Sequence, residues 1–266
     1  MADLLVEKKE HIAILKLNRP DRMNAISVAM LNDLNEALKD FDNDPNVRVI
    51  ILTGEGRGFC SGLDLKDAAS GRGIGGEGVL SGGGGAAHIS TREIPTVTLH
   101  RVDLPVICAI NGPAAGYGFD LALGCDLRLI SDRAKLVPAF AKRGIIPESG
   151  GTWYLPRLVG WARACEIGFI ADEIPPARAV ELGLANAVVP HDQLMAEAER
   201  WASKIAANAP LAIRAMKRLF RHGLSEDFES HTHHVLMQLL LLFRSGDFQE
   251  GIQAFIAKRD PTFSGR

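Results

Sequence analysis

The pattern of hydrophobic and polar positions predicts a repeated unit of buried strand, glycine-rich turn and helix. Three apolar runs have the length of buried strands, at residues 11–18, 47–53 and 105–110. The last two lead into turns of small residues, at 54–66 and 111–118, each followed by a helix start. This order directs free backbone N–H groups and a helix N-terminus at one point, where negative charge is stabilised. Two such units side by side would each supply one N–H group to a shared anion.

Helical periodicity covers much of the remaining chain. Ser27 has the position of an N-cap for a helix that ends near residue 41. The chain is almost wholly helical from residue 210, and the stretch 235–243 is apolar nearly all round, which indicates burial at an oligomer interface. Further strands are predicted at 126–131, 135–138 and 185–189, and further helices at 152–158, 162–170, 176–182 and 192–207. We therefore predict an α/β protein with a core over residues 1–200 and a helical oligomerisation region over residues 201–266.

Composition and charge narrow the possible partners. The chain has 266 residues, of which 47% are hydrophobic, enough for one large domain with an appendage. A net charge of -2 gives no electrostatic footprint for nucleic acid or an anionic membrane, so neither partner is expected. The four cysteines are widely spaced and fit no zinc or CxxC pattern. Without a signal-peptide core or a bilayer-spanning apolar run, a cytoplasmic protein is expected.

Residues 68–90 are rich in glycine, and Gly71, Gly73 and Gly76 formally match the dinucleotide motif GxGxxG. No strand precedes the match, and more glycine follows it where the motif needs a helix. We therefore interpret this segment as a loop that covers a pocket.

Two acidic residues are candidates for proton transfer. Asp120 lies in the first turn of the helix after 111–118, where it is either a reactive carboxylate or a partner of the helix dipole. Glu148 lies in a turn at 143–152, where it either caps the following helix or acts as an acid/base group. An isolated acid after Ile145-Ile146-Pro147 favours the catalytic interpretation of Glu148.

Three histidines, His231, His233 and His234, lie in one predicted helix, and the first and last of them share a face. A metal site would need further converging ligands, and the sequence around them contains no such motif. We therefore expect a solvated or interfacial role, and no metal site.

Five segments together resemble the crotonase, or enoyl-CoA hydratase/isomerase, superfamily. They are NRPDRMNAIS, FCSGLDLK, AINGPAAGYGFDLALGCDLRL, RGIIPESGGTWYLPRLVG and EGIQAFIAKRDP, in this order along nearly the whole chain. The resemblance implies a spiral of ββα units with a C-terminal helical trimerisation region, assembled as a homotrimer or a dimer of trimers. It also implies an acyl-CoA thioester substrate and no metal or redox cofactor.

The resemblance assigns roles by position. The backbone N–H groups of Leu63 and Tyr117 would form an oxyanion hole for the thioester. Arg22 and Lys66 would contact phosphates of CoA. The residues expected to bind the substrate are Arg22, Met23, Ala25, Ser61, Gly62, Asp64, Leu65, Lys66, Gly116 and Phe140, with Phe255 and Lys258 reaching CoA from a neighbouring subunit.

The chain departs from typical hydratases, which use two glutamates to hold and split water. Asp120 occupies the first of these positions, and Phe140, which transfers no proton, occupies the second. The turn that contains Glu148 resembles the ring-epoxide and enoyl-CoA isomerase branch, where an acid at this place is the base. We therefore expect an enoyl-CoA hydratase/isomerase with Glu148 as the principal acid/base and Asp120 as its partner or water positioner. The alternatives are a non-catalytic acyl-CoA binder and another reaction of the superfamily, such as thioester hydrolysis.

Overall fold

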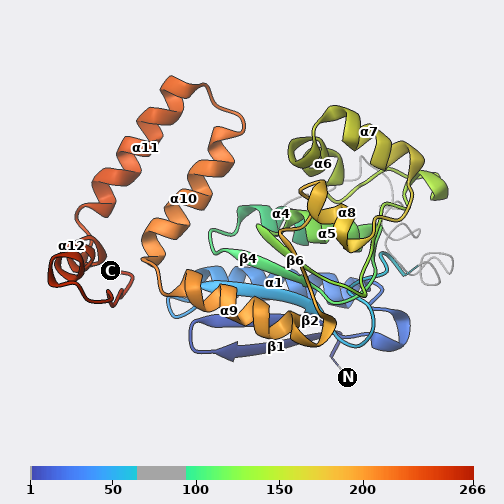
Figure 1. Ribbon diagram of the computed structural model, residues 1–266, viewed down its shortest axis with the longest axis horizontal. Helices are drawn as coiled ribbons and strands as arrows, with labels where there is room; N and C mark the ends of the chain where they lie inside the picture. Colours follow the sequence, from blue (N-terminus) through green and yellow to red (C-terminus); the bar gives the residue numbers. More distant parts are fainter. Residues whose placement is uncertain (1, 65–93) are drawn as a thin grey trace, which may run out of the picture.

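A computed structural model describes residues 2–64 and 94–266 of the chain (Figure 1). Within this part, a six-stranded sheet has the strand order β1-β2-β3-β4-β6-β8. All neighbouring strands are parallel except the first pair, which is antiparallel. The strands of this sheet are β1 (Leu4–Lys9), β2 (Ile12–Leu17), β3 (Val49–Gly54), β4 (Val106–Ile110), β6 (Leu127–Ser131) and β8 (Ala187–Val189). A second, two-stranded sheet pairs β5 (Ala114–Ala115) with β7 (Leu136–Val137).

Helices cover both faces of the large sheet and continue beyond it at the C-terminus. The helices of the core are α1 (Val28–Asn43), α4 (Pro95–Arg101), α5 (Tyr117–Gly124), α6 (Gly151–Val159), α7 (Trp161–Ile170), α8 (Pro176–Glu181) and α9 (Leu194–Ala206). The C-terminal helices are α10 (Pro210–Gly223), α11 (Phe228–Leu242) and α12 (Gly246–Ala257). Short 3₁₀ helices are η1 (Pro20–Arg22), η3 (Ala141–Arg143) and η4 (His191–Gln193).

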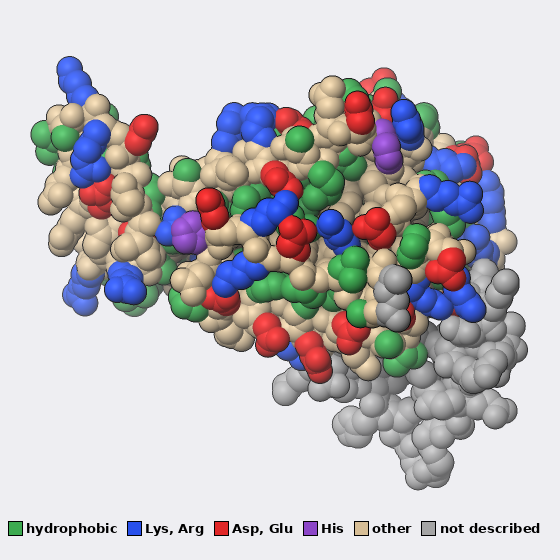
Figure 2. Space-filling model, turned by 90° about the horizontal axis from the view of Figure 1, so that it is seen from below, with side chains coloured by type: hydrophobic (Ala, Val, Ile, Leu, Met, Phe, Trp, Pro, Cys, Tyr) green, Lys and Arg blue, Asp and Glu red, His purple; other side chains and the backbone are tan. Residues whose placement is uncertain are grey.

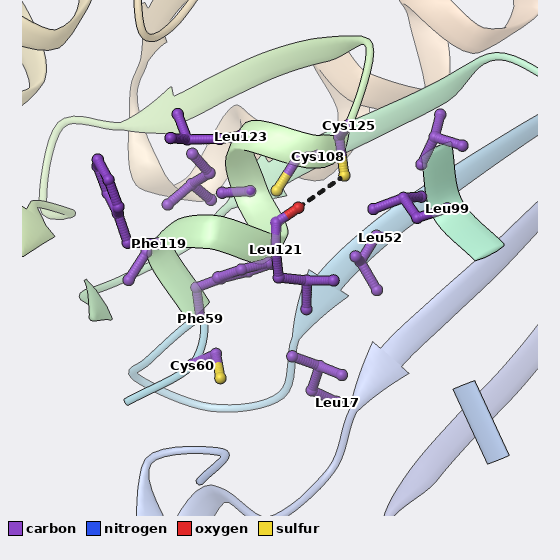
Figure 3. Packing of buried hydrophobic residues seen from close by; sticks show 14 of the residues in the cluster. Leu17, Leu52, Phe59, Cys60, Leu99, Cys108, Phe119, Leu121, Leu123 and Cys125 are labelled. Atoms are coloured by element: carbon purple, nitrogen blue, oxygen red, sulfur yellow. Dashed lines mark hydrogen bonds between the residues drawn. The ribbon is translucent and has the colours of Figure 1, made fainter. Parts of the chain in front are cut away.

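The sheet is buried on both faces because successive residues of each central strand point to opposite sides. In β3, Ile50 and Leu52 belong to a core shared with α1, α4 and α5, whereas Val49 and Ile51 belong to a core shared with α9. Figure 3 shows part of the first core, a cluster in which Phe119, Leu121 and Leu123 of α5 are joined by Leu17 of β2 and Leu52 of β3. This packing places α5 in the same core as β3 and β4.

Most of the predicted elements are confirmed. The three apolar runs form β2, β3 and β4, and Ser27 caps α1 by accepting a hydrogen bond of 3.1 Å from Met30 N–H. The sequence did not predict β1, because Leu4 alone of its residues is buried and its strand structure depends on pairing with β2. The structure also contains α4 and β5, which the pattern did not indicate.

Helix α10 is tied to the core by ion pairs. Arg214 pairs with Asp42 at 3.0 Å, and Lys217 pairs with Asp126 at 2.6 Å. Helices α11 and α12 project beyond the sheet (Figure 1), and α11 has no buried residue within this single chain. No helix in the described part of the chain is long and apolar enough to cross a bilayer. Figure 2 shows acidic and basic side chains interspersed over much of one face of the molecule.

Candidate active site

The two glycine-rich turns lie side by side, as the repeated sequence unit predicts. Ala115 N–H donates to the Cys60 carbonyl at 2.8 Å, and Cys60 N–H donates to the Pro113 carbonyl at 3.2 Å. Gly62 has a φ of 95°, and a Cβ there would lie 2.9 Å from the Ala115 carbonyl and 3.5 Å from Tyr117 N. Gly62 therefore allows a backbone approach that a side chain would prevent.

Near this approach, two backbone N–H groups, those of Leu63 and Tyr117, are not used in the pairing of the turns. Ile26 bonds to both neighbours of Leu63, accepting from Asp64 N–H and donating to the Gly62 carbonyl, so Leu63 N–H is not used in this pairing. Tyr117 is the first residue of α5, whose N-cap supplies no side-chain acceptor. Neither amide has a backbone acceptor within the described residues. Such a pair, at a helix N-terminus, is suited to binding an anionic oxygen.

Asp120 lies in the first turn of α5 and is completely buried. Its Oδ2 accepts a hydrogen bond of 3.0 Å from Ser149 N–H, while its Oδ1 has no partner within the described residues. Burial raises the pKa of Asp120 to about 7, opposed by backbone hydrogen bonds from the Ser149 turn. A Cβ at Gly151 would lie 2.1 Å from Oδ1. Asp120 is therefore held in close contact with the turn that carries Glu148.

Glu148 has a more open environment than Asp120, because the residue is partly exposed to solvent. It lines a cavity of about 300 Å³ between α4 and α6. Partial burial raises the pKa of Glu148 above its ordinary value. The raised pKa and the open position together give Glu148 the features of an acid/base group.

Aromatic rings form one wall of this cavity. His100 and Tyr154 are joined by a hydrogen bond of 3.0 Å between Nδ1 and the hydroxyl oxygen. The Trp153 ring lies edge-on to both, with centroids 5.1 Å from His100 and 5.0 Å from Tyr154. These three residues were not identified from the sequence, and they offer an apolar, aromatic surface next to Glu148.

Two further positions lie in the core. The Tyr117 side chain is buried, its hydroxyl has no partner within the described residues, and burial raises its pKa. Phe140 is 3% exposed and packs in the core shared with α5. The position at which typical hydratases have their second glutamate therefore carries no acid in this chain. Neither side chain lines the cavity at Glu148.

The loop at 19–26 and the turn at 58–64 are joined to each other by hydrogen bonds and ion pairs. Ser61 N–H donates to the Met23 carbonyl at 3.0 Å, and the Arg22 guanidinium pairs with Asp64 at 2.8 Å. Two residues outside the sequence predictions complete this junction. Arg19 donates to the Ala25 carbonyl at 2.7 Å and pairs with Asp64 at 3.1 Å; Asn24 donates to the Gly58 carbonyl at 2.8 Å.

The other predicted substrate-binding residues fall in different places. Gly116 is the N-cap of α5, beside the Gly62 turn. Leu65 and Lys66, and the glycine-rich segment 68–90, lie outside the described residues. Phe255 and Lys258 are exposed at the end of α12, at the opposite end of the molecule from α6 (Figure 1). Within one chain, they therefore do not join the Glu148 cavity.

The sheet, the paired turns and the trailing helices define a crotonase fold. A sequence model of the family described as Enoyl-CoA hydratase/isomerase matches residues 7–266, and the chain belongs to this family. It is 35% identical over 267 residues to 1,2-epoxyphenylacetyl-CoA isomerase of Escherichia coli (strain K12), covering 100% of both chains. It is 32% identical over 268 residues to crotonyl-CoA hydratase of Syntrophomonas wolfei, covering 98% of this chain and 97% of the relative. The crystal structure of enoyl-CoA hydratase from Bacillus anthracis is similar with a TM-score of 0.88 and 33% identity, covering 99% of this chain and 100% of that one.

Proposed function

We propose that the protein is an acyl-CoA enzyme that stabilises a thioester enolate and moves a proton with Glu148. The proposal is supported by the close approach of the Gly62 turn, which precedes Leu63, to the start of α5 at Tyr117, and by the hydrogen bond that joins Asp120 of α5 to the turn carrying Glu148. The amides would polarise the thioester carbonyl and hold the enolate oxygen after a proton leaves Cα or Cγ. One such donor is typically worth about 3 to 4 kcal/mol of the barrier.

Double-bond isomerisation fits the site better than hydration. A single base can take a proton from one carbon of the substrate and return it to another. Syn hydration is easier with two groups that hold the water, and the second acid here, Asp120, is completely buried. Glu148 is the acid that faces the cavity among the described lining residues, so we assign it the proton shuttle and assign Asp120 the support of its turn. This chemistry requires no metal or redox cofactor.

The CoA part of the substrate would lie along the junction between the loop at 19–26 and the turn at 58–64. The hydrogen bonds between Ser61 and Met23, and between Asn24 and Gly58, support this assignment because they hold both backbones in fixed positions. Phe255 and Lys258 would complete the CoA site from a neighbouring subunit.

That neighbour would be a second copy of this chain, in a homotrimer or a dimer of trimers. The support is the apolar surface of α11 and α12, where Leu240 is 56% exposed, Leu241 64% and Phe255 85%. Chains assemble to cover patches of this kind. Light scattering after size exclusion should give three or six chains for the wild type and fewer for Leu240→Lys. A wild type that runs as a monomer would contradict the assembly.

A spectrophotometric screen against enoyl-CoA thioesters of different chain length tests the proposed reaction. Isomerisation of a 3-enoyl-CoA creates the absorbance of the conjugated thioester, whereas hydration of a 2-enoyl-CoA removes it. We expect the absorbance to rise with 3-enoyl substrates. Binding of these thioesters without any turnover would instead identify an acyl-CoA binder and refute the proposal.

A further inference from the structure

Three histidines and one glutamate converge at the turn between α10 and α11. Glu226 is the centre of this group: His222 Nδ1 lies 3.2 Å from Oε1, and His231 Nδ1 and His234 Nδ1 lie 3.2 Å and 3.0 Å from Oε2. Both oxygens of Glu226 therefore have an imidazole nitrogen within hydrogen-bond distance.

The group contains more potential ligands than the histidine-rich stretch of α11 alone. His222 and Glu226 precede α11 and reach His234 because the chain reverses between the two helices. The ligand atoms of His222, Glu226 and His234 all lie within 4.8 Å of one another. His231 approaches the same carboxylate as a fourth donor, in the sequence pattern His-x3-Glu-x4-His-x2-His.

We propose that His222, Glu226 and His234, assisted by His231, bind a Zn²⁺ ion that links α10 to α11. Imidazole nitrogen with one carboxylate is a donor set that suits zinc and other late transition metals, whereas magnesium and calcium prefer oxygen ligands alone. Tetrahedral zinc with bonds of about 2.0 to 2.1 Å places its ligand atoms about 3.3 Å apart. The present separations, which are at most 4.8 Å, therefore need to close by up to about 1.5 Å. The exposed side chains of His222 and His234, each 54% accessible, have room to rotate.

The proton balance of this step is simple. In a neutral imidazole whose Nδ1–H donates to Glu226, the proton moves to Nε2, and the Nδ1 lone pair then faces the ion. The Glu226 carboxylate offers its oxygen without losing a proton. The bound ion would restrain the end of α10 against α11, in the region proposed to form the contacts between subunits.

The neighbouring histidine provides a matched control. His233 lies in the same helix, adjacent to His234, and makes no contact with Glu226 among the described residues. His233→Gln therefore changes the histidine content as much as His222→Gln or His234→Gln does, without removing a proposed ligand. Circular dichroism and size exclusion of each variant confirm that it is folded and assembled as the wild type.

The experiment is calorimetric titration of ZnCl₂ into tag-free, chelator-treated protein. We expect one ion per chain in the wild type and in His233→Gln, and at least about tenfold weaker binding in His222→Gln, Glu226→Gln and His234→Gln. Co²⁺ added to the wild type should give the intense visible absorption of a tetrahedral site, and this absorption should be lost in the same three variants. No binding by the wild type, or equal binding by all variants, would overturn the proposal, since the group would then be a set of hydrogen bonds only.

Discussion

The start of α5 and the turn at 147–150 each carry one acid, and the two acids have opposite surroundings. Asp120 is completely buried and accepts a hydrogen bond from Ser149 N–H, whereas Glu148, one residue earlier in that turn, is exposed and lines the cavity. Burial raises the pKa of both groups, but of these two acids only Glu148 is among the described residues that line the cavity. The difference indicates that a perturbed pKa does not by itself identify the proton carrier. Access to the cavity supports our proposal that Glu148 moves the proton and that Asp120 positions its turn.

Removing the acidity of Glu148 should give the largest effect. Glu148→Gln keeps the size of the side chain, so we expect kcat to fall at least about a hundredfold while KM changes little. Steady-state kinetics on a substrate found in the screen measure both values. Glu166→Gln, which neutralises an exposed acid paired with Arg163 on α7, is the control and should retain wild-type turnover. Unchanged turnover in Glu148→Gln would remove the distinction between the two acids.

Neutralising Asp120 should change the dependence of stability on pH. The folded state raises the pKa of Asp120 from 3.8 to about 7, so the folded protein holds a proton that the unfolded chain has lost. The stabilising contribution is complete below about pH 4 and is lost as the pH rises to about 7. Between pH 5 and pH 8 the wild type should therefore lose about 2 to 3 kcal/mol of unfolding free energy relative to Asp120→Asn.

Urea unfolding of both proteins at the two pH values measures this difference. Other titrating groups are common to both proteins and cancel in the comparison. Parallel changes in the two proteins would show that Asp120 ionises as freely in the folded state as in the unfolded chain.

A side chain added at Gly151, where the turn that carries Glu148 meets Asp120 of α5, should have a smaller effect on activity and stability. In Gly151→Ala, the new Cβ would lie 2.1 Å from Asp120 Oδ1, so the turn must shift. We expect a loss of about 1 to 3 kcal/mol in stability, together with reduced kcat because Glu148 moves with the turn. Gly168→Ala in α7 is the control: nothing lies within 4 Å of its new Cβ, and a helical alanine should stabilise by up to about 1 kcal/mol. Equal stability of the two variants would contradict the close contact at Asp120.

The sequence predicted the parts of the structure that local patterns determine. Apolar runs gave β2, β3 and β4, the Ser27 cap marked α1, and repeated glycine turns indicated a shared anion site. The hydrogen bond between Asp120 and Ser149 joins residues 29 positions apart, so no local pattern contains it. The sequence therefore left the role of Asp120 open, and burial distinguishes it from Glu148.

The sequence also did not predict the contacts between distant elements at the proposed zinc site and at the Glu148 cavity. His222 and Glu226 join His234 only because α10 and α11 reverse direction at the intervening turn. The aromatic wall combines His100 from α4 with Tyr154 from α6. The role of the Leu63 and Tyr117 N–H groups as an oxyanion hole came from the family resemblance together with the repeated turn. It remains a prediction.

The most direct test of the division between the two acids is proton exchange at the substrate carbon. A saturated acyl-CoA in deuterated buffer exchanges its Cα protons only through the enolate, and nuclear magnetic resonance follows their loss. We predict exchange by the wild type, exchange within about tenfold of that rate by Asp120→Asn, and a rate at least about a hundredfold lower for Glu148→Gln. Exchange by Glu148→Gln at the wild-type rate, with Asp120→Asn inactive, would contradict the account and make Asp120 the proton carrier.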